Sequence, residues 1–265
     1  MKKYRLKVQN DIVYLFILLT LTEFFNYLVP NTRGIGLIIT GGLGILLLET
    51  WFIRTFQIYS GKKISKYSDV IVRISLKERF FSYFVLPSIF YISILAFLFF
   101  NRNLILGHVV LGICMVLFLV LFLNVKSSLN KIYSVENATR AVFDFICITI
   151  LYLLTNIFVR VGLSMLVFAL VVFVTAVVLL LFSLKLHKKL GMIEIGVSIL
   201  SSIFIACLTI IFWNTNIFVI PLVSALGFYL VISMWNIRFA GKIHLTDYIL
   251  PFLYVVLALI LILTI

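Results

Sequence analysis

Nine stretches of about twenty mostly apolar residues follow one another along this chain, and this succession constrains the fold more than any other feature. An α-helix needs about 20 apolar residues to cross a hydrocarbon core about 30 Å thick. A spanning segment of this length is helical because its backbone N–H and C=O groups must be paired within the segment itself. The predicted spans are 12–29, 35–53, 80–100, 104–124, 141–159, 163–183, 195–213, 218–235 and 248–265.

The composition agrees with this reading of the apolar stretches. Hydrophobic residues make up 64% of the chain and charged residues only 12%, whereas about 25% of an ordinary soluble domain is charged. A transmembrane β-barrel would show alternating segments of about ten residues instead of continuous runs. The sequence therefore predicts an all-α, polytopic membrane helical bundle in which residues 1–265 form a single transmembrane domain.

The lysines and arginines predict the orientation of the spans. With the N-terminus inside, all of the 22 Lys and Arg residues except Arg33, Arg102 and Arg160 fall in inside segments, as the positive-inside rule requires. The C-terminus is then outside. Because the outside turns are short and polar, we expect four helical hairpins closed on the outside, followed by a ninth helix.

Acids and tryptophans mark the predicted ends of the spans. Asp11, Glu194 and Asp247 each precede a span that runs from inside to outside, so we expect them at helix N-termini, where the helix dipole favours a negative charge. Three tryptophans, Trp51, Trp213 and Trp235, lie at span ends, and we expect their indole rings at the level of the lipid headgroups.

The inside loop 54–79 is the longest polar segment and is strongly basic. Its Lys62, Lys63 and Lys66 are candidates for contact with anionic lipid headgroups, which attract cations at the cytoplasmic surface. The alternative is a loop that sets the topology and merely touches lipid. The expected partner of the chain is the lipid bilayer, with no nucleic acid, and protein partners are left open.

Glu23 lies in the middle of the apolar stretch "LLTLTEFFNY" and is the one acid that falls away from the predicted inside face. Thr20, Asn26 and Tyr27 lie at helical spacing from it, so we expect one polar stripe that faces other helices, because a charge in lipid costs about 2.5–3.5 kcal/mol or more. Polar residues at a similar depth on other spans complete a candidate outer cavity, whose members are Glu23, Asn26, Thr40, His108 and Asn156.

Two interpretations of this outer polar layer remain open. In the first, Glu23 and its neighbours only join helices, each contact being worth about 0.6 kcal/mol. In the second, Glu23 and His108 line an outward-facing cavity, and Arg33, Arg102 and Arg160 form a rim that attracts an anionic ligand. Histidine changes its charge near neutral pH, so a step coupled to a proton is chemically possible there. The segment "TGGLG" beside Thr40 predicts close packing within the first hairpin.

No recognisable catalytic motif, cofactor site or metal-ligand set occurs in the sequence. The three cysteines lack CxxC spacing and predict buried free thiols. Neither of the longer inside loops carries the DxxxD spacing of magnesium-bridged diphosphate chemistry. We therefore expect a non-enzymatic protein with a structural, scaffolding or lipid-interacting role. The alternatives are a transporter of a small solute or lipid that uses the outer cavity, and a membrane-embedded enzyme that acts on a lipid-linked substrate.

The residue usage also suggests a location. Lysine outnumbers arginine, and isoleucine, phenylalanine and asparagine are abundant, which is typical of an AT-rich genome, and we expect a prokaryotic one. The expected location is the cytoplasmic membrane, which the chain crosses several times.

Overall fold

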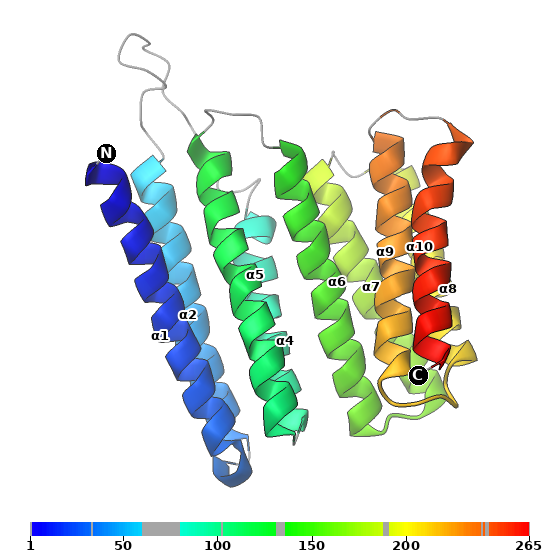
Figure 1. Cartoon of the computed structure of the whole chain (residues 1–265), viewed down its shortest axis with the longest axis horizontal. Helices are drawn as coiled ribbons and strands as arrows, with labels where there is room; N and C mark the ends of the chain where they lie inside the picture. The colour runs from blue at the N-terminus through cyan, green and yellow to red at the C-terminus, as the bar shows by residue number, and fades with distance from the viewer. Residues whose placement is uncertain are drawn as a thin grey trace. The chain divides into compact units, whose positions relative to one another are not determined.

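A computed structural model describes residues 2–32, 34–59, 80–101, 103–130, 136–187, 191–239, 241 and 244–264. Within these residues the chain forms nine α-helices and one π-helical turn (Figure 1). These elements are α1 (Lys2–Thr32), α2 (Ile35–Tyr59), η1 (Phe81–Val85), α4 (Leu86–Phe100), α5 (Leu104–Asn130), α6 (Glu136–Val161), α7 (Met165–His187), α8 (Met192–Ile211), α9 (Val219–Phe239) and α10 (Leu245–Thr264). The predicted all-helical, polytopic fold is confirmed.

Eight of the helices, α2 and α4–α10, are long and apolar enough to cross a membrane, which identifies a multi-pass membrane protein. Several helices continue past the apolar stretches. For example, α1 begins at Lys2 and α5 ends at Asn130, because a helix pairs its own backbone groups and can extend beyond the hydrocarbon core. A membrane crossing by α1 and the inside position of the N-terminus stay predictions.

The chain divides into two compact units, Met1–Phe143 and Asp144–Ile265. Each unit is described by itself below. The single transmembrane domain expected from the sequence stays a prediction.

In the first unit, α1 packs against α2 and α5, and α2 packs against α4. An aromatic cluster fills the end of this unit where α2 ends and α4 begins. Trp51 stacks on Phe122 with ring centroids 3.8 Å apart, and Phe52 meets both of these rings edge-on. Trp51 is only 2% exposed, so its indole contacts other side chains of the unit, and its position at the headgroup level stays a prediction.

A π-helical turn opens the third hydrophobic segment of this unit. Pro87 lies in the first turn of α4 and has no N–H to donate. Just before it, the Leu86 N–H donates to the carbonyl oxygen of Phe81, five residues back. The wider turn accommodates the proline without ending the helix.

The glycines of "TGGLG" allow close packing, but of α2 on α4 rather than of the first hairpin. A Cβ atom on Gly44 would overlap the ring of Tyr91, and one on Gly41 would lie 3.7 Å from Leu95. Gly42 faces open space. The expectation of a helix-contact patch is therefore correct for Gly44, whereas the predicted partner helix is wrong.

In the second unit, α7 packs against α8, α8 against α9, and α9 against α10. The hydroxyls of Thr155 on α6 and Ser224 on α9 lie 3.2 Å apart and are both buried. Glu194 and Asp247 lie in the first turns of α8 and α10, as predicted. Cys114 and Cys147 are buried as expected, whereas Cys207 on α8 is exposed.

We predict that Gly44→Ala destabilises the protein by about 1–3 kcal/mol, because the added methyl group forces the fully buried Tyr91 ring out of its position. Gly42→Ala on the same helix is the matched control, and it should leave the stability unchanged or raise it slightly, since alanine favours a helix over glycine. Unfolding of the purified protein in detergent measures both changes. Equal effects of the two substitutions would contradict the close contact.

Candidate functional site

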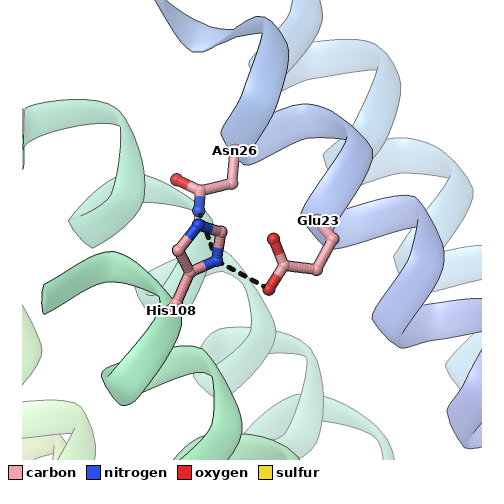
Figure 2. Close-up of polar contacts among 3 residues, drawn as sticks. All are labelled: Glu23, Asn26 and His108. Carbon is pink, nitrogen blue, oxygen red and sulfur yellow. Dashed lines mark hydrogen bonds and ion pairs between the residues drawn. The ribbon is translucent and has the colours of Figure 1, made fainter. Parts of the chain in front are cut away.

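Glu23 on α1 and His108 on α5 contact each other directly. Oε1 of Glu23 lies 3.0 Å from Nδ1 of His108, and Figure 2 shows the two side chains reaching toward one another from separate helices. The sequence placed these two residues at a similar depth but could not say whether they meet. The structure brings them together with Asn26, and these three residues form what we call the outer cluster.

Asn26 supplies the third side chain of the outer cluster. Its Nδ2 lies 3.5 Å from the same His108 Nδ1. A carboxylate requires a hydrogen on Nδ1, whereas an amide nitrogen requires a lone pair there, so one nitrogen cannot satisfy both partners at once. The contact with Glu23 has an ordinary hydrogen-bond length, and the contact with Asn26 is at the outer limit. Nδ1 therefore donates to Glu23.

The outer cluster is accessible rather than enclosed. The side chains of Glu23 and His108 are 37% and 55% exposed, while Asn26 is buried.

The other two residues of the predicted polar stripe, Thr20 and Tyr27, point away from the outer cluster. Tyr27 is 81% exposed, and the exposed Thr20 donates to the carbonyls of Phe16 and Ile17 on its own helix. The expectation that Thr20 and Tyr27 share a helix contact with Glu23 is wrong.

A second polar contact lies next to the outer cluster. The Thr22 hydroxyl donates to the Leu18 carbonyl oxygen at 2.6 Å and lies 3.3 Å from the Tyr91 hydroxyl. Because the single threonine hydrogen is already used, the Tyr91 hydroxyl donates to Thr22. Gly107 on α5 leaves room for Asn26, whose Oδ1 would lie 3.3 Å from a Cβ atom added there. Both contacts hold α1 in position beside α4 and α5.

The other predicted site residues that the structure describes do not share this contact. Thr40 is buried in α2. Asn156 belongs to the second unit, where its Oδ1 accepts a 2.7 Å hydrogen bond from Nε of Arg160, whose guanidinium lies 5.7 Å from the Phe218 ring centre. The remaining predicted positions, Arg33, Arg102, Lys62, Lys63 and Lys66, lie outside the described residues.

The structure reveals a polar cluster that the sequence analysis missed. Oδ1 of Asp11 accepts a 2.9 Å hydrogen bond from Nε1 of Trp51, and Oδ2 forms an ion pair with Nζ of Lys126. Asp11 is 3% exposed, and its carboxylate joins α1, α2 and α5. We call these three residues the Asp11 clamp.

Asp11 was expected to begin a helix, but α1 begins at Lys2 and places Asp11 well inside it. A dipole contact at the helix N-terminus is therefore not its role. The available signal was the presence of Trp51 and Lys126 at the same predicted membrane face, each at the end of an apolar stretch. That signal does not identify the partners of Asp11, because many side chains lie at the same depth in the membrane.

The second unit contains a related carboxylate. Asp144 on α6 is 4% exposed. Its Oδ1 accepts a hydrogen bond from the Ser183 hydroxyl of α7, and its Oδ2 accepts one of 2.9 Å from Nδ2 of Asn236 on α9. Like Asp11, Asp144 holds three helices together, which is a structural role.

No family model, curated protein or solved structure matches this chain. Across the residues that the structure describes, no three His, Cys, Asp or Glu side chains gather closely enough to hold a metal ion.

We predict an energetic coupling between Glu23 and His108. In a double-mutant cycle of Glu23→Gln and His108→Ala, the coupling should be about 0.6–1.7 kcal/mol, the average and upper values for polar contacts between membrane helices. Unfolding free energies in detergent provide the four measurements. The control cycle pairs Thr20→Ala with His108→Ala and should be additive, since the Thr20 hydroxyl bonds only its own helix. Additivity of both cycles would show that the Glu23 contact contributes nothing.

We predict that Asp11→Ala lowers the free energy of unfolding by about 3–5 kcal/mol, because it removes the carboxylate from a buried ion pair and the acceptor from the Trp51 N–H. Asp247→Ala is the control at a helix N-terminus and should cost less than about 1 kcal/mol. Chemical unfolding of the three proteins measures the difference. If the two variants lost similar amounts of unfolding free energy, the Asp11 clamp would contribute no more than an exposed charge at a helix end.

Proposed function

We propose that this multi-pass membrane protein is a carrier that binds a small polar solute from the outer side at the outer cluster, through Glu23 and His108. The observation that supports this proposal is the exposure of the pair. A hydrogen-bonded carboxylate and imidazole lie 37% and 55% exposed on an otherwise apolar helix surface.

The energy of exposed charge favours a water-facing site. A charged side chain in contact with lipid costs about 2.5–3.5 kcal/mol or more, and such residues normally face a bundle interior or a watery cavity. A contact that served only to join helices would be most favourable if both side chains were buried, as Asp11 and Asp144 are. We infer that the open side of Glu23 and His108 meets water or a ligand.

The chemistry of the outer cluster fits a polar solute. It presents the Glu23 carboxylate, which accepts hydrogen bonds, and the Nε2 edge of the His108 imidazole, which accepts one, since Nδ1 already donates to Glu23 and Asn26 is buried. A solute with hydrogen-bond donors can bind here and replace the bonds that its donors made with water. The scaffolding role and the role as an enzyme on a lipid-linked substrate stay alternatives.

The water-facing position can be tested by thiol accessibility in proteoliposomes. In a Cys207→Ser background, a membrane-impermeant thiol reagent should modify His108→Cys several-fold faster than Ile39→Cys. The two positions are well matched, since each lies one turn into its helix at the predicted outer end and each is more than half exposed. Cys114 and Cys147 are buried and should stay unmodified. Slow modification of both variants would place the outer cluster in lipid and contradict the proposal. Equally fast modification of both would also contradict it, because the rate would then depend only on how far each position lies from the membrane surface.

The binding step is tested with a panel of amino acids, carboxylates and sugars. A solute that binds the folded protein raises its stability by about 2.7 kcal/mol at a concentration of 100 Kd. This stabilisation should disappear in Glu23→Gln and persist in Thr20→Ala. A ligand that stabilises wild type and Glu23→Gln equally binds elsewhere and would contradict the proposed site.

A further inference from the structure

A groove in the second unit lies between α8, α9 and α10 and has a volume of about 260 Å³. Among its lining residues, Val197 and Ser201 of α8 and Val231 of α9 lie farther from the helix termini. Trp235 and Arg238 of α9 and Tyr248 of α10 lie nearer the termini, at the end of the groove that we call its mouth. The groove is therefore mainly apolar away from the helix termini and carries a charge at its mouth.

The mouth lies where α8 and α10 begin and α9 ends. The sequence predicts this end of the unit to be on the inside face, since α9 leads into the inside segment with Arg238. The Arg238 guanidinium lies 5.8 Å from the Trp235 ring centre. Cation–π contact of this kind holds the arginine near the ring face.

Arg238 is available to an external anion. Among the described residues it forms no ion pair with a carboxylate. The two nearest acids along the helix ends, Glu194 and Asp247, lie in the first turns of α8 and α10, where helix dipoles offset their charge. The Glu194 carboxylate turns back onto Gly191, which precedes α8.

We propose that this groove binds one anionic phospholipid of the inner leaflet, with an acyl chain along Val197, Ser201 and Val231 and the phosphate at Arg238 and the Tyr248 hydroxyl. The surroundings of a membrane-spanning helix are lipid, and α10 has only two buried residues, Pro251 and Val255. A groove of about 260 Å³ suits a single chain, since pockets for whole drug-sized ligands begin near 300 Å³. The charge at the mouth selects an anionic head over a zwitterionic one.

The proposal is tested by measuring the lipid that stays bound after purification from vesicles of equimolar phosphatidylglycerol and phosphatidylcholine, by native mass spectrometry. Wild type should retain the anionic lipid with about a fivefold preference, as expected for one arginine at a membrane surface. Arg238→Gln should lose this preference and Arg238→Lys should keep it. Arg54→Gln, at an exposed arginine in the first unit, is the matched control and should behave as wild type.

A second variant tests the apolar part of the groove. Val197→Trp fills it and should remove the retained lipid while the helical content and elution volume stay unchanged. If Val197→Trp does not fold, the comparison of Arg238→Gln with Arg238→Lys decides alone. An unchanged preference in Arg238→Gln, or unchanged retention in folded Val197→Trp, overturns the proposal. A wild-type dimer that Val197→Trp dissociates also overturns it, because the occupant is then a second copy of the chain.

Discussion

The buried carboxylate of Asp11 is the contact on which the first unit depends most. Helices in a bilayer gain little from burying apolar surface against one another, because the lipid tails are equally apolar, so polar contacts and close packing decide which helices meet. Asp11 joins α1 to α2 through Trp51 and to α5 through Lys126. Farther along the same pair of helices, Glu23 meets His108. The geometry of the outer cluster therefore rests on a clamp several turns away.

The second unit uses an aspartate in the same way. Asp11 lies on the first helix of its unit and contacts the second and fourth helices, α2 and α5. Asp144 lies on α6 and contacts α7 and α9, again the second and fourth helices of its unit. In both units another polar contact joins the first and fourth helices, namely Glu23 with His108 and Thr155 with Ser224. The described partners of Asp11 include Lys126, and those of Asp144 include Ser183 and Asn236.

In the described ranges, the order and approximate bounds of the apolar helices were predictable, because a run of about twenty apolar residues leaves the backbone few alternatives in lipid. The direction of single side chains was not. Thr20 shares a helix with Glu23 at favourable spacing but faces outward, and Trp51 lies at a span end but stacks on Phe122. Depth along a helix can be read from its own sequence, whereas the neighbour on each face depends on helices distant in the chain. For the same reason Glu23 and His108 could be assigned a similar depth but not a contact.

The donation from His108 Nδ1 to Glu23 has a consequence for the part of the ring that can meet a further group. Nδ1 holds its hydrogen in this bond, so Nε2 is the ring nitrogen that keeps an open lone pair. In the part of the chain that the structure describes, Nε2 has no hydrogen-bond partner, and the side chain is more than half exposed. A hydrogen-bond donor can therefore reach Nε2 while the bond between α1 and α5 stays in place. Contact with a further group and attachment of the helices thereby involve opposite edges of one imidazole ring.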